Sequence, residues 1–234
     1  MSVGLGNKSR WSVVVVYAIA MAWVEAAVVY YLRTMVSRIE PHQSNPLPIA
    51  GNLGNAELIR EAATLVMLLA VGTLAGRSWR ARLGYTAIAF GFWDLFYYVF
   101  LKVLCGWPHG VLDWDILFLL PLPLWGPVLA PALISILMIV WGTLVTSDGS
   151  RTGTGGREEA KAWVISALGV GIALCVFMAD AIRAAGHGTE AVRRVLPLTF
   201  NWGWFCLALG LMSAPVSLRL WRLRCRTGEV CAQY

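Results

Sequence analysis

The chain has 234 residues, of which 58% are hydrophobic and only 14% are charged, and its formal net charge is +6. A soluble domain has about 25% charged residues, so this composition excludes an ordinary soluble protein. The positive charge does not indicate a nucleic-acid partner, because no basic block is interleaved with aromatic residues on a polar segment. We expect an all-α polytopic integral membrane protein, with a single transmembrane domain over residues 1–234 in contact with the lipid bilayer.

Six apolar runs are long enough to cross a bilayer, since about 20 helical residues span the hydrocarbon layer. A Gly- and Ser-rich stretch within 146–160 predicts a flexible cytoplasmic loop, and residues 222–234 are expected to form a cytoplasmic tail. In chain order, the predicted spans are residues 11–32, 58–75, 83–105, 127–145, 163–182 and 198–220.

The first span carries one half of an apparent internal repeat. Residues 18–33 (AIAMAWVEAAVVYYLR) align without a gap with residues 87–102 (AIAFGFWDLFYYVFLK), at an offset of 69. Residues 66–76 align with 136–146 at an offset of 70 and share Gly-Thr-Leu. We therefore expect tandem two-helix units over about 11–77 and 79–147, followed by a third helix pair over 161–221. The alternative is that apolar helices match one another because their composition is restricted.

Segment 116–126 (ILFLLPLPLWG) is apolar but is unsuited to a regular helix, because Pro121 and Pro123 remove backbone donors. Bare backbone is not tolerated against lipid. The segment should therefore be extended or broken, at the interface or packed against other helices. Pro127 is then expected as the first residue of the fourth helix.

The basic residues predict the orientation of the chain. With the N-terminus in the cytoplasm, 12 of the 19 Lys and Arg residues fall on the inner side and seven fall on the outer side. The positive-inside rule then predicts that both termini are cytoplasmic. We expect the membrane to be the cytoplasmic (inner) membrane of a bacterium.

The repeat places one carboxylate, Glu25 or Asp94, in the middle of each first helix. A charge at that depth costs a few kcal/mol or more, which makes an accidental position improbable. Most other acids and all three histidines fall toward the outer side, which predicts a polar cavity opening outward. If the two acids meet, they should share a proton or hold a cation. Together with Glu61 they are the candidate metal ligands.

Aromatic residues close in sequence to the two acids are candidates for the lining of this cavity. Tyr97 and Tyr98 lie three and four residues after Asp94, so at least one of them shares its helix face. Trp23 and Trp93 lie deep in their spans beside the acids. These tryptophans either line a pocket or fill space between helices.

Polar residues nearer the span ends complete the candidate binding set. Lys102 lies about two turns beyond Asp94 and either guards an entrance or extends to the headgroups. Asn201 lies in the outer part of the last span. Glu61 joins the binding set too, although Glu61 and Asp115 fall in predicted first turns, where a carboxylate simply complements the helix dipole.

Three functions fit this pattern, and the sequence names no cofactor. The first is outward-open binding or transport of a small cation, a metal or a protonatable solute. The second is a membrane-embedded enzyme acting on an isoprenoid or quinone-like substrate, with Asp94 or Glu25 as general acid or base. The third is a non-catalytic subunit or assembly factor of a larger membrane complex. A transport pathway through six spans would also suggest a homo-oligomer.

Overall fold

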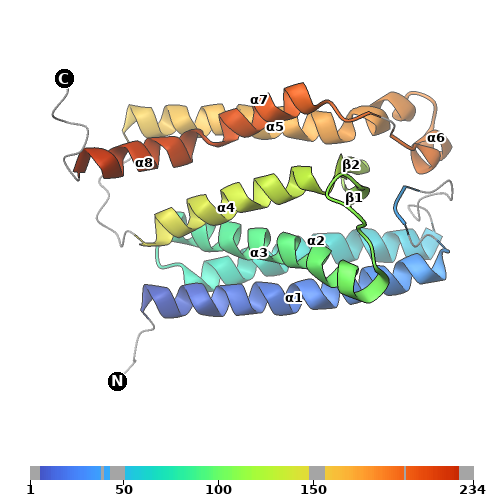
Figure 1. The fold of residues 1–234 in the computed structure, drawn as a ribbon, viewed down its shortest axis with the longest axis horizontal. Helices are drawn as coiled ribbons and strands as arrows, with labels where there is room; N and C mark the ends of the chain where they lie inside the picture. Colours follow the sequence, from blue (N-terminus) through green and yellow to red (C-terminus); the bar gives the residue numbers. More distant parts are fainter. Residues whose placement is uncertain (1–5, 38–39, 43–50, 148–155, 198, 227–234) are drawn as a thin grey trace.

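The computed structural model describes residues 6–37, 40–42, 51–147, 156–197 and 199–226 (Figure 1). Six helical stretches are long and apolar enough to cross a membrane. A short helix, α6 (Thr189–Arg194), lies between the fifth and the sixth. The spans are α1 (Asn7–Met35), α2 (Gly51–Ala75), α3 (Trp79–Cys105), α4 (Leu129–Ser147), α5 (Arg157–Ala185) and Trp202–Arg222, which combines α7 (Trp202–Met212) with most of α8 (Ala214–Arg226).

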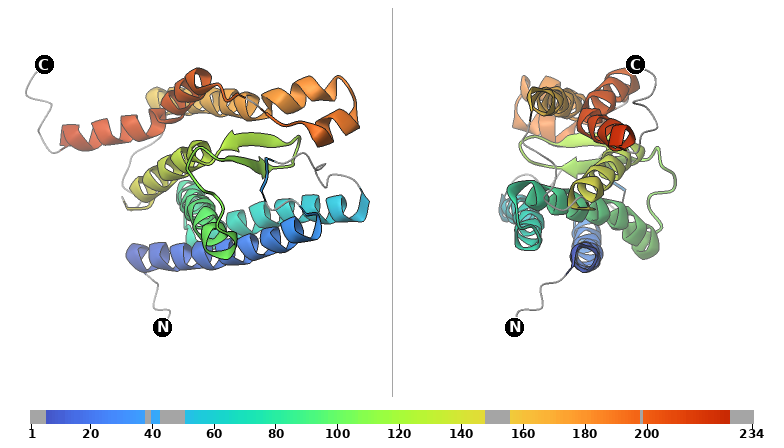
Figure 2. Two further views of the ribbon diagram at one scale, coloured as in Figure 1. Left: turned by 45° about the vertical axis from the view of Figure 1, so that its right-hand side comes forward. Right: turned by 90° about the vertical axis from the view of Figure 1, so that its left-hand side faces the viewer.

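The helices form two layers, with a short β-hairpin between them (Figures 1 and 2). In the first layer α3 is central and packs against α1, α2 and α4. In the second layer α5 packs against α7 and α8. The layers meet where α5 contacts the hairpin and where α4 contacts α8. The start of α1, the end of α8 and the turn between α2 and α3 lie at one end of the molecule (Figure 1). We call this the α2–α3 end.

Small residues allow the helices of the first layer to approach closely. Ala18, Ala22 and Ala26 follow one stripe of α1 and are fully buried. A methyl group added at Gly142 of α4 would lie 2.4 Å from the carbonyl oxygen of Gly84 in α3, so the two backbones are in contact there. The buried stripe and the glycine contact together explain how α3 can carry neighbours on three sides.

The hairpin consists of β1 (Trp114–Phe118) and β2 (Leu124–Pro127), which pair in antiparallel register with Trp114 opposite Pro127. The expectation that segment 116–126 is extended and packed against helices is confirmed for its strands. The expectation that Pro127 begins the fourth helix is wrong. Pro127 ends β2, and the next two amides donate to loop carbonyls of Asp113 and Val111, so α4 begins only at Leu129.

Most span boundaries lie within a few residues of those predicted, and the largest shift is at α2. This helix begins at Gly51, seven residues before the predicted start at 58. The prediction followed the apolar run, and residues 51–57 are too polar to belong to it. Helix α8 continues to Arg226, so the predicted tail begins within a helix. Most of the predicted loop, residues 148–155, and tail residues 227–234 lie outside the described residues.

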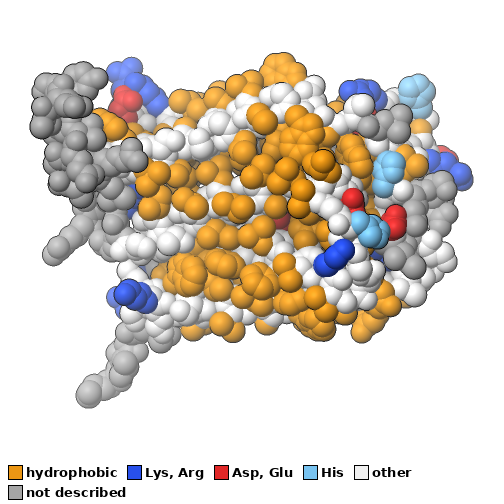
Figure 3. Space-filling view, in the orientation of Figure 1, with side chains coloured by type: hydrophobic (Ala, Val, Ile, Leu, Met, Phe, Trp, Pro, Cys, Tyr) orange, Lys and Arg blue, Asp and Glu red, His pale blue; other side chains and the backbone are white. Residues whose placement is uncertain are grey.

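The surface matches a protein that crosses a membrane. Hydrophobic side chains cover the middle of the face shown in Figure 3, and charged side chains gather toward its two ends. The chain is therefore a helical, multi-pass membrane protein. Its orientation and the tandem repeat stay predictions.

Candidate functional site

A cavity of about 90 Å³ lies between α1, α2, α3 and β1. It lies nearer the end where α1 ends and α2 begins, here called the α1–α2 end. Its lining is rich in titratable side chains: five carboxylates (Glu25, Glu57, Glu61, Asp94 and Asp115), two guanidiniums (Arg33 and Arg60), and Tyr97 and Tyr98. We call this the acidic cavity.

Helical spacing explains why so many polar groups reach one place. In α2, Glu57, Arg60, Glu61 and Thr64 follow one another at intervals of three, one and three residues, which places them on a single helix face. In α3, Asp94 shares its face with Tyr97 and Tyr98 in the same way. Each helix therefore directs one short polar stripe into the cavity.

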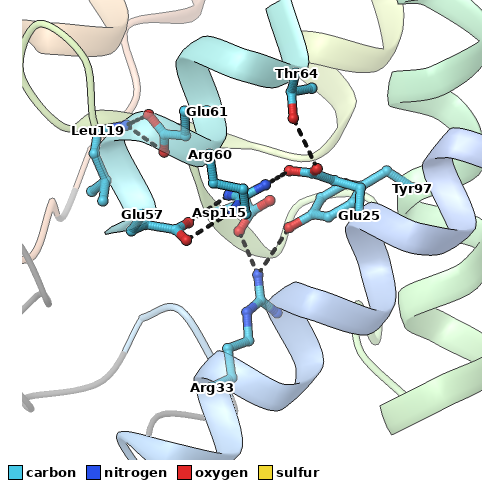
Figure 4. A network of polar contacts seen from close by, with 9 residues as sticks. All are labelled: Glu25, Arg33, Glu57, Arg60, Glu61, Thr64, Tyr97, Asp115 and Leu119. Carbon is cyan, nitrogen blue, oxygen red and sulfur yellow. Dashed lines mark hydrogen bonds and ion pairs between the residues drawn. The ribbon is translucent and has the colours of Figure 1, made fainter. Parts of the chain in front are cut away.

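The Arg60 guanidinium joins two helices through two carboxylates (Figure 4). Its Nη1 donates to Glu25 Oε1 in α1, and its Nε donates to Glu57 Oε2 at 2.8 Å. Thr64 Oγ1 donates to the other Glu25 oxygen at 3.2 Å. Glu25 is thus compensated by a cation of the chain itself, a partner that the sequence analysis did not name.

A second ion pair joins α1 to the hairpin. Arg33 Nη2 donates to Asp115 Oδ1 at 3.0 Å, and the guanidinium carbon lies 4.4 Å from the ring centre of Trp107. Asp115 is fully buried. Burial raises the pKa of the Asp115 carboxyl above its ordinary value, and the Arg33 guanidinium acts in the opposite direction. The interpretation of Asp115 as a first-turn residue of a helix is wrong, because it lies in β1.

Glu61 anchors the hairpin to α2. Both of its carboxylate oxygens accept from the backbone amide of Leu119, at 3.0 and 2.9 Å (Figure 4). Because α2 begins at Gly51, Glu61 lies nearly three turns into the helix. It is therefore not the first-turn residue that the sequence suggested, and it does not complement the helix dipole.

Asp94 has the weakest compensation of the five carboxylates. Its Oδ2 accepts from Ser135 Oγ of α4 at 2.8 Å, and the residue is 8% exposed. Among the described residues, no arginine, lysine or backbone amide donates a hydrogen bond to Asp94. The other four carboxylates each accept from a guanidinium or an amide.

The charges of the cavity do not balance. Among the described lining residues, five ionised carboxylates against two guanidiniums, with both tyrosines neutral, leave a net charge of −3. Within the described part of the chain, no group of three or more His, Cys, Asp or Glu side chains is arranged to hold a metal ion. The metal candidates Glu25, Asp94 and Glu61 thus line one cavity without forming a common ligand set.

No known family matches the chain. Comparisons with protein-family models, with curated proteins and with solved structures all find no match.

Six of the predicted site residues line the acidic cavity, and three do not. Trp23 is 44% exposed and contacts the edge of Phe100. Lys102 is exposed and donates to the carbonyl of Gly106 at the end of α3. Asn201 caps α7 and borders a different cavity. The predicted residues that do line it are Glu25, Glu61, Trp93, Asp94, Tyr97 and Tyr98.

Sequence reasoning missed the partners of the acids. Arg33 and Arg60 are absent from the predicted site residues, because a basic residue near a span end usually contacts headgroups. The spacing of Glu57 and Arg60 was a usable signal, since residues three apart on a helix form ion pairs. Ser135 was a weaker one, as the single hydroxyl in the apolar run 132–141.

Proposed function

We propose that the chain binds a small cation or protonatable solute in the acidic cavity, as the first step of its transport across the membrane. The observation that carries the proposal is Asp94, a buried carboxylate held by one hydroxyl and by no positive group of the described chain. A buried charge is stable only when it is paired or neutralised. Asp94 must therefore bind either a proton or a cation, and these two compete for one position.

The net charge of the cavity supports the same conclusion. A surplus of three carboxylates in a low-dielectric site attracts cations and protons. The buried indole Nε1 of Trp93 has no acceptor among the described residues, and it borders this cavity. A hydrated cation or a polar solute would supply that acceptor, whereas a dry apolar ligand would not.

Cavity volume argues against the proposed isoprenoid or quinone-like substrate. The volume of about 90 Å³ leaves room for a few water molecules or a small ion. Pockets for larger organic ligands have volumes of roughly 300 to 1,000 Å³. The size therefore favours a small, hydrated or protonated ligand over a lipid-soluble one. The third alternative, a subunit of a larger complex, stays a prediction.

Binding measured together with proton release tests this function. Purified protein in weakly buffered detergent is titrated with NaCl, KCl, NH4Cl or MgCl2, and a pH dye reports protons released. We expect one of these cations to bind saturably and to release up to about one proton per site. Asp94→Asn should abolish both signals, since the amide cannot exchange a proton for a cation.

The matched control is Asp180→Asn. Asp180 pairs with Arg183 at the surface of α5, outside the acidic cavity, so its loss should leave binding and proton release unchanged. Asn at position 94 still offers an oxygen to Ser135, which should preserve the fold. An Asp94→Asn protein that binds cations and releases protons as the wild type does would refute the proposal.

A further inference from the structure

A second, larger cavity lies at the α2–α3 end, far along the helices from the acidic cavity. It has a volume of about 500 Å³ and is enclosed by both layers of the fold. The start of α1, the turn between α2 and α3, and the end of α4 contribute from the first layer, and α5 and α8 contribute from the second. We call it the basic cavity.

The charge of the basic cavity is opposite to that of the acidic cavity. Among the described residues that line it, Glu159 is the one acid, and it pairs with Arg80 at 3.0 Å and with Arg222 at 3.6 Å. Five lining guanidiniums against one carboxylate leave a net charge of +4. The five are Arg10, Arg77, Arg80, Arg219 and Arg222.

Aromatic and aliphatic side chains form much of the remaining wall, together with the polar residues Asn7, Ser78 and Thr146. Trp141 of α4 and Trp163 of α5 meet edge to face with ring centres 5.2 Å apart, and both line the cavity. Trp79 lines it from the first residue of α3, just after the Ser78 cap. A helix begins there with its partial positive charge toward the cavity, which adds to the attraction for anions. Tryptophans beside arginines at helix ends are typical of the headgroup level of a bilayer.

We propose that the basic cavity binds the phosphate headgroup of an anionic phospholipid, with its acyl chains along the Trp141 and Trp163 wall. Guanidiniums bind phosphate oxygens in a bidentate manner, and the described lining holds more guanidiniums than carboxylates. Basic pockets between spans at the headgroup level are suited to such lipids. The paired indoles of Trp141 and Trp163 distinguish a lipid from inorganic phosphate, which has no acyl chain to pack against them. This site is independent of the function proposed for the acidic cavity.

Lipid binding to the purified protein tests the inference. Delipidated protein in a neutral detergent is mixed with phosphatidylglycerol, phosphatidylcholine or inorganic phosphate, and binding is followed by native mass spectrometry and by the thermal midpoint. We expect phosphatidylglycerol to bind and to raise the midpoint, with little effect of phosphatidylcholine or phosphate. The double variant Arg77→Gln/Arg222→Gln should weaken phosphatidylglycerol binding by about tenfold or more.

Lys161→Gln is the matched control, because Lys161 lies at the same end but pairs with Glu158 outside the cavity. It should bind phosphatidylglycerol as the wild type does. Equal stabilisation by inorganic phosphate would identify a soluble-anion site and overturn the lipid proposal. Equal binding of the two lipids, or wild-type binding by the double variant, would also overturn it. Should the double variant not fold in lipid-free detergent, the single Arg77→Gln, in an exposed turn, provides the same test.

Discussion

At the scale of single residues, the acidic cavity shows how buried charges are compensated in pairs. The side chain of Asp115 is 1% exposed and that of Arg33 is 11% exposed, so neither charge is screened by water. Removing one partner of such a pair leaves the other charge buried and uncompensated. The stability of the hairpin against α1 should therefore depend on both partners being present or both being absent.

A double-mutant cycle on this pair tests that dependence. Arg33→Met or Asp115→Leu alone should lower the free energy of unfolding by ~3–5 kcal/mol, whereas the double variant should lose much less than the sum. Reversible chemical denaturation in detergent micelles would measure all four proteins. The exposed pair Arg183 and Asp180 is the control, for which the coupling should be about 0–1 kcal/mol. Single variants at positions 33 and 115 that behave like this surface pair would contradict the argument.

The residues that sequence reasoning could find are those that stand out from their surroundings. Glu25 and Asp94 were recognised because each interrupts an apolar run. The roles of Arg60 and Arg33 were missed because a basic residue near a span end is ordinarily solvated. Lys102 and Trp23 do not line the acidic cavity, and the sequence could not reveal this because it does not fix how each helix is rotated against its neighbours.

At the scale of elements, α3 organises the first layer through close backbone contacts. Both glycines of the Gly-Thr-Leu matches pack on it: a methyl group at Gly72 would lie 2.1 Å from Thr86, and one at Gly142 would lie 2.4 Å from Gly84. The spans themselves were predictable from apolar length. The pairing of β1 with β2 was not, because the prolines exclude a helix without specifying a partner strand.

Alanine substitution of a tightly packed glycine and of an unhindered glycine should change the free energy of unfolding in opposite directions. Gly142→Ala should lower the free energy of unfolding by ~1–3 kcal/mol, since α4 must move away from α3 to admit the methyl group. Gly171→Ala in α5 is the control, because no heavy atom lies within 4 Å of the added group. There we expect a gain of up to about 1 kcal/mol from helix propensity. Equal effects at the two positions, measured by the same denaturation, would show that the α3–α4 contact is not tight.

At the scale of the whole molecule, two cavities of opposite charge lie toward opposite ends of the spans. The acidic cavity is near the α1–α2 end, and the basic cavity is at the α2–α3 end. The positive-inside rule predicts that the basic end faces the cytoplasm and that the acidic end faces outward. This arrangement would present the acidic cavity to solutes outside the cell.

Labelling from one side of the membrane checks the orientation. In a variant lacking the native cysteines, single cysteines replace Ser9, at the start of α1, or His187, in the turn after α5; both positions are exposed. A membrane-impermeant maleimide added to intact spheroplasts should label the cysteine at 187 and leave that at 9 unlabelled until the cells are lysed. The reverse pattern would place the acidic cavity on the cytoplasmic side.

Because Arg60 lies between two carboxylates on different helices, the charge compensation of Glu25 depends on the relative position of α1 and α2. Glu57 belongs to the same helix as Arg60 and travels with it, whereas Glu25 belongs to α1. If α2 slides away from α1, the Arg60 guanidinium keeps Glu57 as its counter-ion, whereas Glu25 loses its ion pair with Arg60. A displacement of α2 would thus leave the Glu25 carboxylate uncompensated in the space that receives the ligand, while Arg60 stays paired with Glu57.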